Sequence, residues 1–167
     1  TAADAAEIRT LMRSRAQAVL TGDREGFVAT IDDADVDLAA QQAEIFDNLR
    51  ELPLTDLSYV VGTSTGSPER IAGGDPLAAP RVVEHLSMRG VLGASLATRQ
   101  PITFVRRDGA WVVARAAAPR SPVAPPWTGG PIDVAASPCL LVVTDEGARP
   151  GAAVVAARQK ANEAAVT

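Results

Sequence analysis

The chain has 167 residues, which suits one domain with a short additional piece, and 47% of them are hydrophobic, enough for one core. Its formal net charge of −4 at pH 7 argues against a nucleic-acid or anionic-membrane partner, because both are held by clustered basic residues. The single cysteine, Cys139, excludes an internal disulfide and a cysteine-rich zinc site, so neither a metal nor another cofactor is expected.

The front of the sequence has the periodicity of helices. Apolar residues recur at helical spacing over Asp4–Leu20, and the spacing of Asp4 and Glu7 is that of a capping box. Gly22 is expected to end this helix, and Asp23 to begin a short second one.

A third helix is expected to end at Leu52, because Pro53 cannot continue it. Its apolar stripe consists of Leu38, Gln42, Ile45, Leu49 and Leu52. Four aspartates precede it, at positions 32, 33, 35 and 37, and we interpret them as a turn and as helix caps. They do not match a calcium-binding EF-hand loop, which needs glycine at its sixth position and glutamate at its twelfth.

After Pro53 the hydrophobic period changes to two, which predicts strands. The first covers Leu57–Val61, and the next covers Arg81–Arg89, with Val82, Leu86 and Met88 on one face and Val83, His85 and Ser87 on the other. The stretch Gly62–Pro80 between them is rich in Gly, Pro, Ser and Thr, and is interpreted as a long loop with one weak strand at Glu69–Ala72.

A hairpin is the strongest local prediction. Two apolar strands within Pro101–Arg115 flank Asp108-Gly109, a pair that supplies the positive φ angles of a type I′ turn. We expect the hairpin to pair with the strand at 81–89 and its Arg106-Arg107 tip to be solvated. The fold class predicted is α+β, with N-terminal helices packed on a curved antiparallel sheet.

The back of the sequence is predicted to be a separate piece. Residues 116–131 have the composition of a linker, so the domain division expected is 1–118, a Pro-rich linker at 119–131, and an appendage or the start of a following domain at 132–167. In the appendage we expect strands at Ile132–Val134 and Cys139–Val143 and a helix at Gly151–Val166. Trp127 in the linker either attaches it to the first domain or marks a partner surface, and we favour attachment.

Four phrases of the sequence resemble a known family. These are RSRAQAVLTGDREGFVATID, IFDNLRELPLTDLSYVV, ITFVRRDGAWVVARA and PWTGGPIDV, which together span about residues 7–135. They are similar to nuclear-transport-factor-2-like, or SnoaL-like, cone domains of actinobacterial exported or membrane-attached proteins. The resemblance implies a cystatin-like cone fold and an extracytoplasmic setting reached through segments outside this chain, with the cytoplasm as the alternative.

In that group a cone domain often precedes a peptidase-like domain, and cone domains often dimerise through the outer face of the sheet. The resemblance therefore implies as partners the remainder of the same polypeptide or a homodimer partner, with a small apolar ligand also conceivable. No peptidase activity is carried over, because the His-Glu-x-x-His zinc motif is absent and His85 is the single histidine. The family includes enzymes, binding modules and structural partners, so its fold does not decide the function.

Four residues are the candidates for a pocket. His85 is a possible acid or base, Asp47 a possible base, and Tyr59 a possible stabiliser of an oxyanion. Trp111 joins them as an aromatic wall, although its expected role is to anchor the core. Each also has a purely structural interpretation, which we favour, so no catalytic residue is assigned.

Two functions follow from these observations. The first is a non-catalytic accessory or interaction module of a larger exported protein, favoured by the scarcity of titratable pocket residues. The second is a small-molecule binder or an isomerase- or cyclase-type enzyme using the cone cavity. Convergence of Asp47, Tyr59 and His85 on one cavity would favour the second, because proton transfer requires hydrogen-bonding distance.

Overall fold

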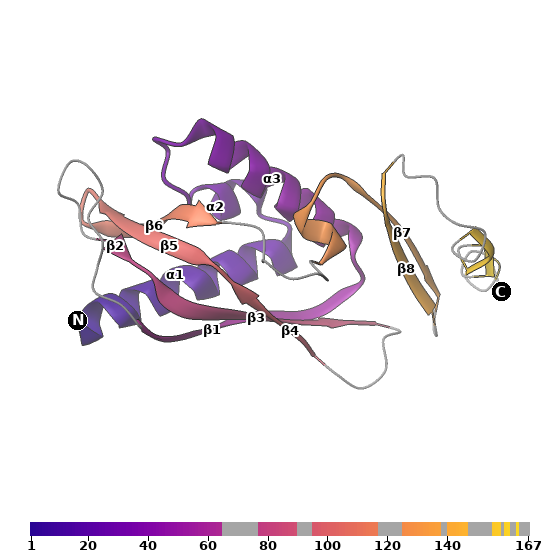
Figure 1. Cartoon of the computed structure of the whole chain (residues 1–167), viewed down its shortest axis with the longest axis horizontal. Coiled ribbons are helices and arrows are strands. Elements are labelled where there is room, and N and C mark those ends of the chain that lie inside the picture. Colours follow the sequence, from indigo (N-terminus) through magenta and orange to yellow (C-terminus); the bar gives the residue numbers. More distant parts are fainter. Residues whose placement is uncertain are drawn as a thin grey trace.

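The computed structural model describes residues 1–64, 77–89, 95–116, 125–137 and 140–146, together with 155–157, 159, 160 and 163. Within this part the chain is α+β, as predicted, with three N-terminal helices packed on antiparallel strands (Figure 1). The helices are α1 (Ala2–Thr21), α2 (Arg24–Val28), α3 (Val36–Glu51) and the 3₁₀ turn η1 (Pro126–Thr128). The strands are β1 (Leu54–Ser64), β2 (Leu77–Ala78), β3 (Pro80–Met88), β4 (Leu96–Gln100), β5 (Ile102–Arg107), β6 (Ala110–Ala116), β7 (Ile132–Ser137) and β8 (Leu140–Asp145).

The first helix begins earlier than its predicted start at Asp4. The Thr1 hydroxyl accepts a hydrogen bond from the Asp4 amide, and the Asp4 carboxylate accepts one from the Thr1 nitrogen, so the capping box is Thr1–Asp4 and not Asp4–Glu7. The predicted end is confirmed, because Gly22 adopts φ 79° and terminates the helix in the left-handed conformation.

The third helix begins and ends as its sequence predicts. The carboxylate of Asp35 caps it by accepting a hydrogen bond from the Leu38 amide, and Leu52 follows its last turn. Capping does not account for Asp32, however. This carboxylate is buried and paired with Arg107, which lowers the pKa of Asp32 below its ordinary value.

The sheet is one long antiparallel ribbon with a bend in it. Val82 of β3 pairs with Gln100 of β4, and Leu77 of β2 pairs with Val105 of β5. The two pairings have the same register, because Leu77 lies five residues before Val82 and Val105 lies five residues after Gln100. β2 and β3 therefore follow one strand path, and β4 and β5 follow another, and both paths are interrupted at the same level. Pro80 and Pro101 lie at the interruption, where a residue without an N–H breaks the hydrogen-bonded ladder.

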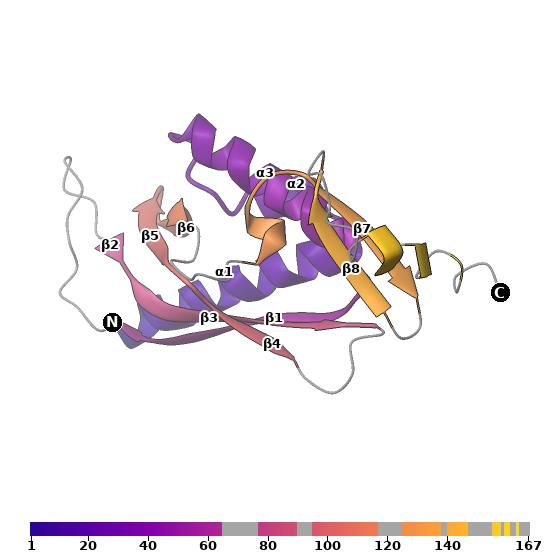
Figure 2. The same cartoon turned by 45° about the vertical axis from the view of Figure 1, so that its right-hand side comes forward.

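The predicted partner of the hairpin is wrong in one respect. β5 and β6 pair around Asp108 (φ 48°) and Gly109 (φ 86°), which confirms the hairpin and its turn. The added strand is the short β2, however, whereas β3 pairs with β1 and with β4, a strand that was not predicted. The bent ribbon curves around α1, which lies along its concave side, with α2 and α3 beyond α1 (Figures 1 and 2).

The hairpin turn is exposed at Asp108 and Gly109, as predicted, but the two arginines before it are half-buried and attach the hairpin to the helical layer. Arg106 forms ion pairs with Asp4 and Glu7 of α1, and Arg107 forms the pair with Asp32. All three carboxylates are far away in the sequence, two on α1 and one between α2 and α3, so no local pattern predicts these pairs.

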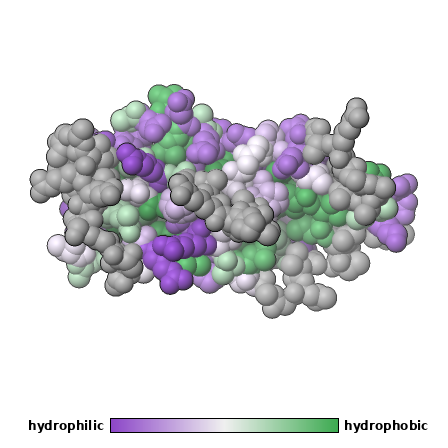
Figure 3. Space-filling view, in the orientation of Figure 1, coloured by the Kyte–Doolittle hydropathy of each residue, from purple (hydrophilic) through white to green (hydrophobic). Residues whose placement is uncertain are grey.

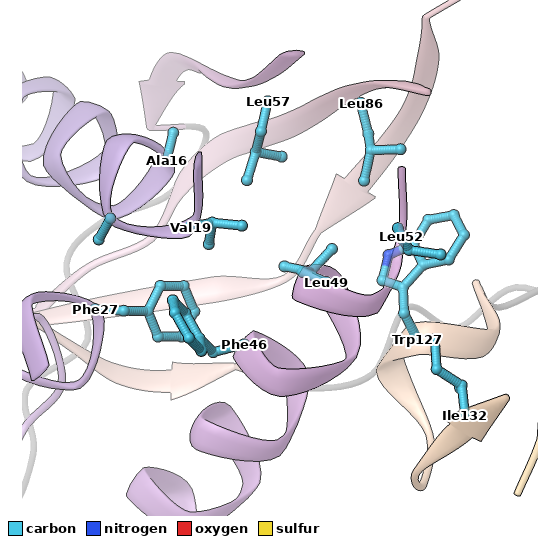
Figure 4. Packing of buried hydrophobic residues seen from close by; sticks show 11 residues of the cluster. Ala16, Val19, Phe27, Phe46, Leu49, Leu52, Leu57, Leu86, Trp127 and Ile132 are labelled. Atoms are coloured by element: carbon cyan, nitrogen blue, oxygen red, sulfur yellow. The ribbon is translucent and has the colours of Figure 1, made fainter. Parts of the chain in front are cut away.

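The main core lies between the helices, the sheet and η1. Phe27 and Phe46 meet with ring centroids 5.2 Å apart, and Leu49 packs beside them (Figure 4). Trp127 and Ile132 belong to the same buried cluster, so the attachment of the Pro-rich segment through Trp127 is confirmed. The division of the chain at 118 and 131 stays a prediction.

Strands β7 and β8 pair with each other, and the face in Figure 3 carries a hydrophobic area over them. The weak strand expected at 69–72 and the Cys139 position lie outside the described residues. Of the helix expected at 151–166, the described residues 155–157, 159, 160 and 163 are helical. No described helix combines the length and the hydropathy that crossing a membrane requires.

The turn of the hairpin can be tested at Gly109. A Cβ at this position meets no atom within 4 Å, so a substitution there reports backbone conformation alone. We expect Gly109→Ala to lower the free energy of unfolding by about 1 kcal/mol, because an L-residue is disfavoured at φ 86°. In urea denaturation Gly109→Asn should lose less, since asparagine tolerates this conformation; equal losses would contradict the explanation.

Candidate functional site

A partly open cavity of about 40 Å³ lies between α1, α3, the strands and η1. By this measure of volume a water molecule needs roughly 10–15 Å³, so the cavity holds about three waters or one small polar group. Polar side chains form much of the wall. The lining residues are Arg15, Gln41, Gln42, Ile45, Tyr59, Glu84, Gln100, Ile102, Ala116, Trp127 and Thr128.

Arg15 supplies a buried positive charge at one side of this cavity. It lies on the buried face of α1 and is 3% exposed. Its Nη1 donates to the Thr30 hydroxyl at 2.8 Å, its Nη2 donates to Oε1 of Gln42, and its Cζ lies 3.6 Å from the centroid of the Phe27 ring. Burial lowers the pKa of Arg15, but a guanidinium keeps its proton in proteins.

Glu84 faces the same cavity from the sheet. It lies on the same face of β3 as the buried residues Val82 and Leu86, and it is 5% exposed. Tyr59, its direct partner on β1, donates its hydroxyl to Oε2 at 3.1 Å, and Gln100 on β4 donates Nε2 to Oε1 at 3.2 Å. Burial raises the pKa of Glu84, and burial together with the nearby Glu84 raises the pKa of Tyr59. The phenol therefore stays protonated.

Trp127 closes the cavity, and its indole donor lies near the Glu84 carboxylate without forming a well-aligned hydrogen bond to any described residue. The residue is 6% exposed. Its indole Nε1–H lies near Glu84 and acts to lower the pKa of that residue, against the larger effect of burial. Among the described residues no acceptor meets this N–H at hydrogen-bonding distance and angle. A buried donor left unpaired costs about 1–3 kcal/mol, so an acceptor placed in the cavity would gain a prepared hydrogen bond.

Asn48 holds the closing segment in position. Its Nδ2 donates to the carbonyl of Trp127 at 3.2 Å and to the carbonyl of Gly130 at 3.0 Å. Asn48 lies on α3 and is 4% exposed, so both bonds are sheltered from competing water. The 3₁₀ turn η1 is thus attached to α3 by polar bonds as well as by the apolar contacts of Trp127.

The structure does not bring the four predicted pocket residues together. Tyr59 lines the cavity, as described above. Asp47 lies on the exposed side of α3, where its carboxylate pairs with Arg24 at 3.0 Å and 56% of its side chain is accessible. His85 alternates with Glu84 along β3 and so lies on the opposite face of the sheet. Trp111 is buried in a second apolar cluster, with Val113 and Phe104.

Sequence reasoning missed the polar groups that do converge. A signal existed for two of them, because Glu84 falls between Val82 and Leu86 on the apolar face of its strand, and Gln42 falls within the apolar stripe of its helix. A polar residue at a position that periodicity marks as buried is expected to have a polar partner. Arg15 likewise falls between Met12 and Val19 on the buried face of α1.

The cavity is equipped for recognition by hydrogen bonds. It offers donors at Trp127 and Arg15 and an acceptor at Glu84, and it contains no serine, cysteine, histidine or lysine among its lining residues. Both oxygens of Glu84 already accept hydrogen bonds within the protein. Among the described residues no group of three His, Cys, Asp or Glu side chains is arranged to hold a metal ion.

Comparisons with known proteins add little to this geometry. The sequence matches no protein-family model and no curated protein. Its structure is similar to that of a candidate aromatic ring hydroxylase from Novosphingobium aromaticivorans, with a TM-score of 0.46 and 17% identity over 70% of this chain and 87% of that one. It is also similar to a variant of a protein of unknown function from Mycobacterium tuberculosis, with a TM-score of 0.45 and 15% identity over 94% of this chain and 87% of that one. Likenesses below a TM-score of 0.5 say nothing about activity or ligand.

The raised pKa of Glu84 predicts how the stability of the protein depends on pH. Because its pKa is raised by folding, Glu84 contributes stability that is present below its unfolded pKa of about 4.3 and lost as the pH rises through its folded pKa. Glu84→Gln removes this loss. The free energy of unfolding of the variant, minus that of the wild type, should therefore rise between about pH 4 and pH 8 in urea denaturation.

Asp32→Asn is the matched control, because the pKa of Asp32 is lowered by Arg107. Asp32 contributes stability above its unfolded pKa of about 3.9 that is lost as the pH falls, so its variant should show a difference that decreases as the pH rises from about 2 to 5. A Glu84→Gln difference that stays constant with pH would contradict the raised pKa.

The two hydrogen bonds of Asn48 predict that it holds η1 in place. Asn48→Ala removes two buried hydrogen bonds, and we expect it to lower the free energy of unfolding by about 2 kcal/mol and to shift Trp127 fluorescence towards that of a hydrated indole. The neighbouring Asp47→Ala breaks only the exposed pair with Arg24 and should cost less than about 1 kcal/mol. Equal effects of the two substitutions would show that Asn48 does not hold η1.

Proposed function

We propose that this domain binds a small polar molecule, or the polar end of a larger one, in the cavity between Arg15, Glu84 and Trp127, without transforming it. The ligand carries a carbonyl or carboxylate oxygen that accepts a hydrogen bond from Trp127. The proposal rests on the indole N–H of Trp127, which is buried beside the cavity and meets no acceptor among the described residues at hydrogen-bonding distance and angle.

The size and polarity of the cavity support a polar group over an apolar one. A volume of about 40 Å³ admits a few non-hydrogen atoms, and three of the bordering side chains carry a charge or an unpaired donor. An apolar ligand would leave the Trp127 N–H without an acceptor and would leave the charged groups of Arg15 and Glu84 facing an apolar surface. The small apolar ligand suggested by the family resemblance is therefore replaced in this proposal by a polar one.

Binding without catalysis is favoured by the state of the titratable groups. Glu84 is the one carboxylate among the lining residues, and its two oxygens accept hydrogen bonds from Tyr59 and Gln100, which hold it in place. The lining residues include no histidine to act as a general base and no serine, cysteine or lysine to act as a nucleophile. The accessory role in a larger exported protein remains a prediction from the sequence.

The proposal can be tested with acetate and acetamide as probes in nuclear magnetic resonance titrations. The chain has two tryptophans, so its ¹H–¹⁵N spectrum contains two indole signals, and Trp111 serves as an internal control because its equally unpaired Nε1 does not border the cavity. We expect the Trp127 indole signal to move as the probe is added and the Trp111 signal to stay. A hydrogen bond worth about 1.4 kcal/mol corresponds to a tenfold change in affinity.

Two matched variants complete the experiment. Trp127→Phe should weaken probe binding about tenfold, monitored at the Glu84 and Gln100 amides, whereas Trp111→Phe should leave it unchanged. Should Trp127→Phe fail to fold, the indole signals of the wild-type protein still decide. Joint movement of both signals, or none at any probe concentration, would refute a binding site at Trp127.

A further inference from the structure

A second surface is the groove between α1 and the outer edge of β1, which shares Tyr59 alone with the lining of the cavity. We call it the α1–β1 groove; it has a volume of about 460 Å³. Its lining residues are Arg9, Arg13, Ala16, Gln17 and Leu20 of α1 and the six consecutive residues 56–61 of β1. Successive residues of a strand point to opposite faces, so a wall of six in a row is formed by the edge of the strand.

That edge has unused hydrogen-bonding capacity. β1 is the outermost strand of its sheet, and among the described strands it pairs with β3 alone. Every second residue of such a strand directs its N–H and C=O away from the sheet, and an added extended chain can pair with these groups. β1 spans 11 residues, which makes the open edge longer than a typical strand of 5–6 residues.

The charge of the groove indicates what could lie along this edge. Arg9 and Arg13 are exposed, one turn apart on α1, and no carboxylate among the described residues pairs with either of them. α1 and β1 run in opposite directions (Figure 2). The two arginines, from the first half of α1, therefore lie beside the Val61 end of the strand. Asp56 lies towards the other end of the groove, with Leu20. Two unpaired cations favour an occupant with carboxylates.

The outer face of β1 indicates a second property of the molecule that could bind there. Val60 is 56% exposed there, on the side of the sheet opposite to α1. A strand added beside β1 would place alternate side chains towards α1 and towards this outer face. The first set would meet Arg9 and Arg13, and the second would pack against Val60 as cross-strand neighbours.

We propose that the α1–β1 groove binds an extended acidic peptide segment of a partner protein, which adds to the sheet as a strand beside β1. Its carboxylates alternate with apolar side chains: the carboxylates contact Arg9 and Arg13, and the apolar side chains cover Val60. This mode of recognition combines main-chain hydrogen bonds, which provide affinity, with alternate side-chain contacts, which provide specificity.

The test uses an acetylated and amidated peptide of alternating glutamate and valine, seven residues long, titrated into the ¹⁵N-labelled protein. We expect signals of residues 56–61 to shift and their amides to exchange more slowly with solvent. The double variant Arg9→Glu/Arg13→Glu should lose about tenfold in affinity and should bind the corresponding lysine–valine peptide instead. Arg81→Glu, an exposed arginine on the central strand β3, is the matched control and should bind as the wild type does.

Two further peptides separate strand addition from attraction by charge alone. Each is N-methylated at alternate residues, in one peptide at the odd positions and in the other at the even positions, so that one of them loses the amides facing β1. Strand addition predicts that one peptide loses binding and the other keeps it. Equal binding of both, or equal binding of inorganic polyphosphate with no protection of β1 amides, would overturn the proposal. The Trp127 indole signal should stay in place throughout, so this result is independent of the cavity.

Discussion

The burial of Arg15 in the middle of α1 is the interaction on which the rest of the arrangement depends. A guanidinium cannot leave water unless its donors and its charge are satisfied. Thr30 and Gln42 accept from it, and Phe27 lies against its plane, so a single side chain connects α1 to the α2–α3 region. Glu84 supplies a carboxyl group from the sheet on the other side, and its field acts on Arg15. The helices and the sheet must therefore approach from opposite sides of α1.

The curvature of the sheet makes room for this helix. Two strands continue in register through the level of Pro80 and Pro101, where the ladder is interrupted and the ribbon bends. A flat sheet would cover α1 from one side only, whereas the bent ribbon places Phe104 and Val113 against it as well as Val82. At the opposite end of α1, the hollow is completed by Trp127 rather than by the sheet. The candidate cavity is the small polar space that remains at that junction.

The two proposed sites, the cavity and the α1–β1 groove, both result from the way the bent sheet surrounds α1. Inside the bend, polar residues from α1, α3 and the sheet surround one small cavity, which favours recognition of one small group through fixed hydrogen bonds. Outside the bend, β1 is the edge strand of its sheet among the described residues, beside the exposed face of α1, which favours an extended chain. Neither site requires the other, because α1 presents its buried face to the cavity and its exposed arginines to the groove.

Most of the helices and the hairpin could be predicted from residues close together in the chain. Helical periodicity and capping residues located the three helices, Pro53 marked the end of α3, and Asp108-Gly109 located the hairpin, whereas β4 was not predicted. The long-range contacts could not be predicted in this way: which strands are neighbours, that Arg106 and Arg107 bind carboxylates of the helical layer, and that Arg15, Tyr59, Glu84 and Trp127 surround one cavity. Period-two alternation indicates which face of a strand is buried, but not what faces it. Those partners come from segments tens of residues apart, which are brought together by burial of the shared apolar core and not by any local preference.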